Sequence, residues 1–173
     1  MSRPSIEAWL RGPVAGVPRL LNPAAHALQH AAEDANRALA GLSLDGLWQR
    51  PGGAASVGYH VRHLAGALDR LFTYARGESL SDAQRQSLSR ESEPGEPPQD
   101  GAALGAELGT AIARALDQLR RTPEETLLES RAVGRQRLPS TVIGLLFHAA
   151  EHASRHAGQA LTTAKIVRLR IED

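Results

Sequence analysis

Histidine is the residue type whose spacing in this sequence points to chemistry. The seven histidines fall into three groups: His26/His30, His60/His63 and His148/His152/His156. Two histidines four positions apart lie on one face of a helix about 6 Å from each other, and both rings can then reach one ion at about 2.0–2.1 Å. The chain has no cysteine, so a transition-metal site must use histidine and carboxylate side chains. The histidine groups are therefore the candidates for a metal site.

The third group lies on the helix predicted from about residue 140. At about 100° per residue, His156 falls inside the apolar face and His152 at its near edge, whereas His148 falls further round. Two inward imidazoles repel each other if protonated and cost several kcal/mol if unsatisfied, and a shared metal removes both problems. Because His148 and His156 are about 12 Å apart along the axis, all three do not easily bind one ion. The pair is either His148/His152 or His152/His156, and the inward direction favours the second.

A mononuclear site with an open position needs a third ligand from another helix. His60 and His63 both lie on one flank of the apolar stripe predicted over 56–76, and spacing alone does not choose between them. The competing interpretation is that these are buried histidines in a polar layer without a metal. His26 and His30 lie opposite the apolar stripe of their own helix, so we expect them to be ordinary surface residues that face water.

Four amphipathic helices are predicted to position these histidines. Their expected ranges are about 22–42, 56–76, 102–121 and 140 onward. In each of them apolar residues recur at spacings of three and four. Asn22 followed by Pro23, and Ser56 before the second stripe, predict two of the helix starts. Gly77 and Pro123 predict the ends of the second and third helices.

The composition favours a single all-α domain over the whole chain, residues 1–173. Aromatic residues make up only 3% of the 173 residues, and the abundant Ala and Leu suit closely packed helices better than a sheet. We expect an N-terminal arm over 1–21 and one long, polar crossover over 78–101 between helices two and three.

Shorter features are predicted in the connections. A capped turn is expected at Ser81–Gln84, within the crossover. The loop of Trp48 and Arg50–Gly53 is expected to plug one end of the bundle, and residues 131–138 are expected to be extended.

Charge and hydropathy argue against several partners. The formal net charge is +1, so nothing resembles a field built to attract nucleic acid or an anionic membrane. No stretch of about 18 apolar residues and no leader-like N-terminus occurs, which predicts a cytoplasmic protein.

Two segments of the chain resemble hallmark segments of the DinB-like superfamily. The first is Ser56–Gly66, with its His-Leu pair at His63 and Leu64, and the second is Glu151–Gln159, in which His152, three residues, His156, one residue, Gly and Gln follow in order. The resemblance spans roughly 22–165. It implies a four-helix bundle of up-down-down-up type with a metal, usually nickel or zinc, held by three histidines near one end.

The resemblance also chooses among the histidines. The family's His before Leu falls on His63, and its two ligands on the last helix fall on His152 and His156. His60 and His148 then become candidates for supporting roles about one turn from a ligand, and no catalytic residue is identified.

Members of the resembling family include enzymes that use a low-molecular-weight thiol. The resemblance therefore implies a metal-dependent thiol transferase or hydrolase that acts on a small molecule, and an ion with an open position would supply the acidity for that chemistry. The alternative is a non-catalytic, metal-stabilised module for stress-related binding or dimerisation. A third interpretation is a metal-free helical dimer with buried histidines, and a homodimer is a further expectation in either case.

Overall fold

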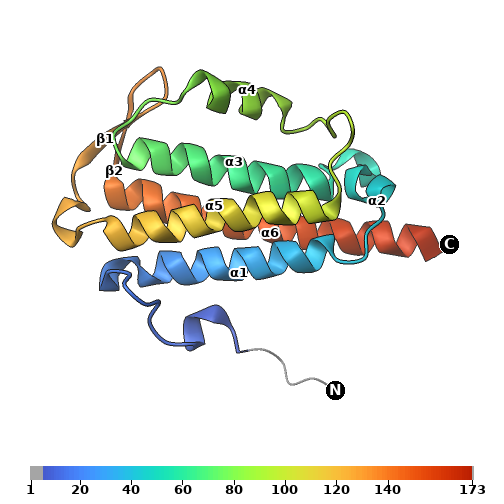
Figure 1. Cartoon of the computed structure of the whole chain (residues 1–173), viewed down its shortest axis with the longest axis horizontal. Coiled ribbons are helices and arrows are strands. Elements are labelled where there is room, and N and C mark those ends of the chain that lie inside the picture. The colour runs from blue at the N-terminus through green and yellow to red at the C-terminus, as the bar shows by residue number, and fades with distance from the viewer. Residues whose placement is uncertain (1–5, 173) are drawn as a thin grey trace.

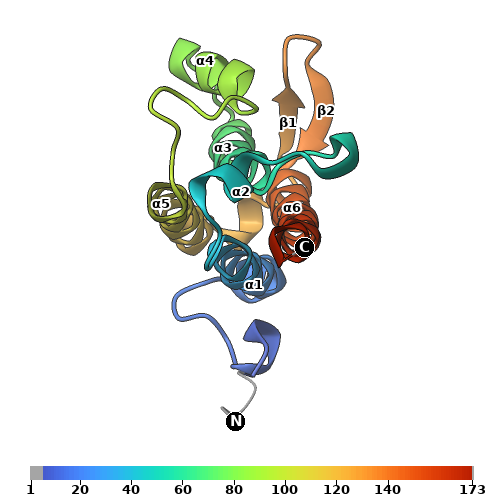
Figure 2. The ribbon, with the colours of Figure 1, turned by 90° about the vertical axis from the view of Figure 1, so that its right-hand side faces the viewer.

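The computed structural model describes residues 6–172, and four long helices form its body (Figure 1). These are α1 (Asn22–Leu39), α3 (Val57–Ala75), α5 (Gly101–Arg121) and α6 (Val142–Glu172). Helices α1 and α3 each pack against both α5 and α6, so α1 and α3 lie across the bundle from each other (Figure 2). The all-α prediction is confirmed. The first helix ends three residues earlier than predicted, at Leu39.

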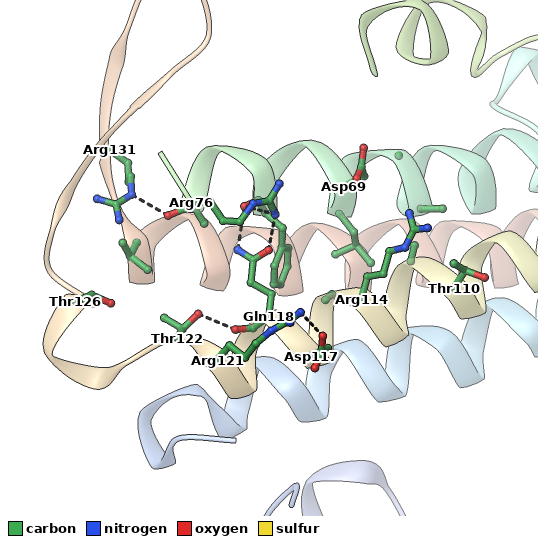
Figure 3. Close-up of a pocket in the computed structure, with 18 of the residues that line it drawn as sticks. Asp69, Arg76, Thr110, Arg114, Asp117, Gln118, Arg121, Thr122, Thr126 and Arg131 are labelled. Carbon is green, nitrogen blue, oxygen red and sulfur yellow. Dashed lines mark hydrogen bonds and ion pairs between the residues drawn. The ribbon is translucent and has the colours of Figure 1, made fainter. Parts of the chain in front are cut away.

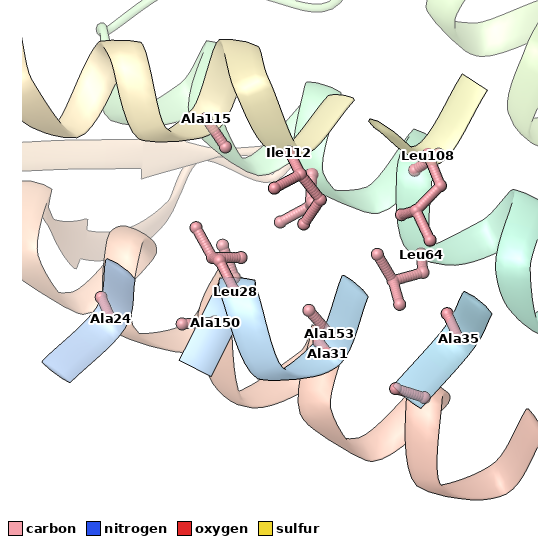
Figure 4. Packing of buried hydrophobic residues seen from close by; sticks show 14 of the residues in the cluster. Ala24, Leu28, Ala31, Ala35, Leu64, Leu108, Ile112, Ala115, Ala150 and Ala153 are labelled. Atoms are coloured by element: carbon pink, nitrogen blue, oxygen red, sulfur yellow. The ribbon is translucent and has the colours of Figure 1, made fainter. Parts of the chain in front are cut away.

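Small side chains let the helices approach closely in the core. Ala31 and Ala35 of α1 and Ala153 of α6 are buried together with Leu28 and Leu64 (Figure 4). Alanine loses little conformational entropy on burial and leaves room for the larger leucines of the neighbouring helices. The apolar stripes read from the sequence are the faces that the bundle buries.

Side-chain caps fix where the helices begin. The Ser56 hydroxyl accepts a hydrogen bond from the backbone N–H of Tyr59 at 3.1 Å, as predicted for the start of α3. Asp100 caps α5 in the same way through the N–H of Ala103 at 2.8 Å. Gly77 follows α3 with φ of 82°, a conformation that favours glycine and ends the helix. Ser56 and Gly77 thus mark the two ends of α3, the helix that carries His60 and His63.

The connection between α1 and α3 is more ordered than the predicted loop. Leu44–Trp48 form a short helix, α2, which Ser43 caps, and Pro51–Gly53 form a 3₁₀ turn, η3. The Trp48 ring packs over Gly58, where a Cβ would lie 2.8 Å from the ring. The expectation of a loop was therefore wrong for Trp48, which ends helix α2, because the Ser43 cap was not recognised.

The crossover between α3 and α5 contains helix α4 (Asp82–Arg90), which lies over α3 (Figure 1). Its start is a capping box between Ser81 and Gln84, where only a capped turn was predicted. Gln84 also donates to Asp69 of α3 at 2.7 Å. Near α5, Arg62 donates to Gln99 Oε1 at 2.6 Å. The crossover is thus attached to α3 at both ends.

A small hairpin joins α5 to α6. Strands β1 (Ser130–Val133) and β2 (Leu138–Thr141) pair antiparallel, with Ser130 opposite Thr141. Extended structure over 131–138 was predicted, but the pairing was not. A 3₁₀ turn, η4 (Glu124–Thr126), precedes the hairpin.

The N-terminal arm contains two 3₁₀ turns, η1 (Ala8–Leu10) and η2 (Arg19–Leu21). It lies along α1, and the buried Ala8 packs there. Residues 1–5 of the predicted arm lie outside the described residues. Within 6–172, no helix combines the length and apolar character that crossing a bilayer requires.

Candidate metal centre

Three histidines from two helices converge on one point between α3 and α6. His63 comes from α3, and His152 and His156 come from α6. Each offers one ring nitrogen, and these nitrogens all lie within 4.8 Å of one another. Nε2 of His63 is 2.9 Å from Nε2 of His152. His152 and His156, one turn apart on α6, therefore point to the same place as His63 of α3. Together the three histidines can hold one metal ion.

The site is mostly enclosed, and two of its three histidines, His152 and His156, are held neutral near pH 7. Burial, and after it the neighbouring His63 and His152, lower the pKa of His156 to about 3. Burial and then His63 lower the pKa of His152 to about 4. Neutral imidazole is the form that binds a metal, so two of the three candidate ligands are ready to bind near neutral pH.

Glu91 is the residue of this centre that the sequence argument missed. It directly follows α4, and its Oε2 lies 2.6 Å from Nδ1 of His63. Its other oxygen pairs with Arg70 of α3. The sequence held one signal for this contact, which is Gly66 in the middle of a helix. A Cβ there would overlap Oε1 of Glu91 and lie 2.7 Å from Nη1 of Arg70.

His60 supports the site from the other side. Its Nδ1 lies 3.1 Å from Nδ1 of His156, and its side chain is buried. This contact occupies Nδ1 of His156 and leaves Nε2 for a ligand. Burial and the nearby His63 lower the pKa of His60 as well. Tyr59 stacks on the ring of His63, with 5.3 Å between ring centroids and 15° between planes.

The donor set fits a divalent cation. When Nδ1–H of His63 donates to Glu91, Nε2 of His63 carries a lone pair and faces Nε2 of His152 at 2.9 Å. Two lone pairs at that distance repel unless a proton or a cation lies between them. Nδ1 of His152 is buried and, within the described residues, has no hydrogen-bond partner. Three imidazole nitrogens without thiolate suit a divalent transition metal.

The remaining histidines lie outside the cluster. The side chain of His148 is 52% exposed, and its Nδ1 is 3.4 Å from Oε2 of Glu151. Its ring centroid is 5.5 Å from that of His152, so it lies beside the site without joining it. His26 and His30 are on α1. Both lie outside the cluster, and Nε2 of His26 is 2.9 Å from the Gly12 carbonyl of the arm, a contact that the sequence did not predict.

A separate cavity of about 970 Å³ lies between α3 and α5 (Figure 3). Its rim carries arginines that are already engaged: Arg76 donates to Gln118, and Arg121 pairs with Asp117. None of the seven histidines lines it. The three candidate ligands therefore lie outside this cavity, although Gly66, which adjoins Glu91, is one of its lining residues.

The protein is thus a helical bundle in which three histidines converge between two of the long helices and could hold a metal ion. The model of the DinB superfamily matches residues 27–160, which is more than half of the chain, and the protein belongs to that superfamily. The crystal structure of the conserved protein of a locus from Enterococcus faecalis is similar in fold. Its TM-score is 0.68 at 21% sequence identity, with 87% of this chain and 98% of that chain covered. A comparison with curated proteins gave no match.

Proposed function

We propose that the protein binds one divalent metal, zinc or nickel, through His63, His152 and His156, and uses it in a thiol transfer or hydrolysis on a small molecule. The observation that carries this proposal is the cluster of three histidine ring nitrogens, which lie within 4.8 Å of one another. The membership of the chain in the DinB superfamily supports it. Low-molecular-weight thiols are the co-substrate that the resemblance of the sequence favours.

The ligand set supports catalysis more than a closed structural site. Three protein ligands leave at least one position on an ion that prefers four or more. Three neutral imidazoles also leave the full positive charge of the ion, so a bound thiol or water becomes acidic near neutral pH. The side chain of His63 is 16% exposed, so the centre is not sealed from solvent.

The residues around the centre differ in burial and in whether they contact a candidate ligand. His60 and Glu91 are buried and contact ligands, so they orient His156 and His63. His148 is half exposed beside His152, so it lies between the site and solvent. We assign it no catalytic step.

The test is a thiol-transfer screen with the metal-loaded protein and a fluorogenic electrophile such as monochlorobimane. Activity should disappear with a chelator and return with zinc or nickel, and His63→Ala should lack it. His30→Ala is the matched control, because His30 lies on α1 away from the centre. The enzymatic function would be refuted if the metal-loaded protein reacted no faster than His63→Ala across many thiols and electrophiles. A metal-stabilised binding or dimerisation module would then remain as the alternative.

A further inference from the structure

Glu91 is a buried carboxylate at the end of an exposed helix. Within α4 itself no residue is buried, whereas Glu91, the next residue, is only 2% exposed. A carboxylate is costly to bury unless it is paired and hydrogen-bonded. The crossover therefore delivers this one side chain into the body of the protein, and its contacts there should explain why.

Both oxygens of Glu91 have specific partners on α3. Oε2 accepts from Nδ1 of His63 at 2.6 Å, and Oε1 pairs with Nη1 of Arg70 at 2.5 Å. Arg70 is itself buried, at 8% exposure. Gly66 supplies the space that the carboxylate occupies, because any side chain at this position would overlap Oε1. The position of the carboxylate is thus fixed by the guanidinium of Arg70, the imidazole of His63 and the space left by the absence of a side chain at Gly66.

We propose that Glu91 is a positioning residue for the metal centre, which fixes the tautomer and ring orientation of His63 and couples docking of the crossover to metal occupancy. A carboxylate that accepts from Nδ1–H keeps the proton there and directs the Nε2 lone pair toward His152. This inference rests on the metal site proposed above, and it adds a residue from a segment that carries none of the three ligands.

The attachment of the crossover makes this coupling specific to Glu91. At one end Gln84 contacts Asp69, and at the other Arg62 holds Gln99, and these contacts involve exposed or partly buried groups. Among residues 78–100, all of which the structure describes, only Glu91 is buried, and it touches the candidate ligand His63. The coupling is reciprocal: if docking of Glu91 raises the affinity for the metal by some factor, bound metal raises the equilibrium constant for docking of the crossover by the same factor.

The first experiment measures zinc affinity by competition with a chromophoric chelator. Glu91→Ala should weaken zinc binding by about 10–100-fold, the range for residues that support a ligand. Glu91→Gln should be weakened less, because its amide oxygen can still accept from Nδ1–H. Glu93→Ala is the matched control, two residues away and exposed, and it should bind zinc like the wild-type protein.

The second experiment measures hydrogen exchange over residues 78–100 with and without saturating zinc. Zinc should slow exchange there in the wild-type protein and in Glu93→Ala, and it should have little effect on that segment in Glu91→Ala. If Glu91→Ala fails to fold because Arg70 is left unpaired, the double variant Glu91→Ala/Arg70→Met removes both buried charges and is measured in its place.

The outcomes separate this inference from the proposed function. Equal zinc affinity in the wild-type protein and Glu91→Ala refutes the role of Glu91 and leaves the metal site intact. A wild-type protein that binds no zinc refutes the proposed function. In that case the ¹⁵N shifts of the His63 ring still decide the positioning role: Nδ1 should be protonated in the wild-type protein, and a mixture of tautomers should appear in Glu91→Ala. The same tautomer in both proteins would refute it.

Discussion

Gly66→Ala should destabilise the protein, although alanine normally stabilises a helix interior. In an exposed helix the change from glycine to alanine gains about 0.5–1 kcal/mol. At this position the new Cβ overlaps Oε1 of Glu91 and lies 2.7 Å from Nη1 of Arg70, so the buried ion pair must move. Breaking such a pair outright costs about 3–5 kcal/mol. A displaced pair costs part of that, and we expect a net loss of about 1–3 kcal/mol in the free energy of unfolding.

Gly109→Ala provides the matched control for this prediction. Gly109 lies inside α5, and a Cβ there meets nothing within 4 Å. This variant should be more stable than the wild-type protein by up to about 1 kcal/mol. Urea unfolding of the metal-free proteins, followed by circular dichroism, compares the two under identical conditions.

A double-mutant cycle identifies the cause of the loss. In the Glu91→Ala background the carboxylate is gone and Arg70 is free to move aside, so Gly66→Ala should become neutral or stabilising. Destabilisation by Gly66→Ala of the same size in both backgrounds would refute the argument that the close approach of Glu91 requires glycine here. Stabilisation by Gly66→Ala in the wild-type background would refute it as well.

Three further predictions concern the histidines and a cap. In urea unfolding, the metal-free protein should lose about 1–2 kcal/mol of stability between pH 7 and 5.5. Burial holds the pKa of His152 near 4 and that of His156 near 3 in the folded protein. Below about pH 6.5 these histidines are therefore protonated in the unfolded state before they are in the folded one, which favours unfolding. Zinc at about 100 times its Kd should stabilise the wild-type protein and His30→Ala by about 2.7 kcal/mol in thermal unfolding and should not stabilise His156→Ala. Ser56→Ala should cost about 1 kcal/mol by removing the cap of α3, also in urea unfolding. Stability that does not change with pH would contradict the first prediction, and equal zinc stabilisation of the wild-type protein and His156→Ala would contradict the second. An unchanged urea midpoint in Ser56→Ala would contradict the third.

The helices and their inner faces could be predicted because local periodicity and burial agree. Leu28 and Ala35 of α1 and Val61 of α3 were placed inside by spacing, and the structure buries all three. The inward direction of His152 and His156 follows from the same construction. Spacing did not choose between His60 and His63, because both face the cluster, and the family resemblance made that choice.

Contacts made across long separations could not be predicted in this way. Glu91 stands in a polar crossover whose composition is typical of solvent-exposed chain, and only Gly66, far away in sequence, marks where it docks. The contact of His26 with the Gly12 carbonyl likewise depends on how the arm lies along α1. The hairpin over 130–141 consists of two short strands with few buried residues, so it lacks the alternation that marks a strand.

The central claim is that His63, His152 and His156 hold one ion, and anomalous diffraction from crystals of the zinc-loaded protein tests it most directly. We predict a single strong peak about 2.0–2.1 Å from one ring nitrogen of each of the three histidines, with Nδ1 of His63 still bonded to Glu91. A peak on His148 or on His30, or the absence of any peak between α3 and α6 in zinc-saturated crystals, would contradict the claim.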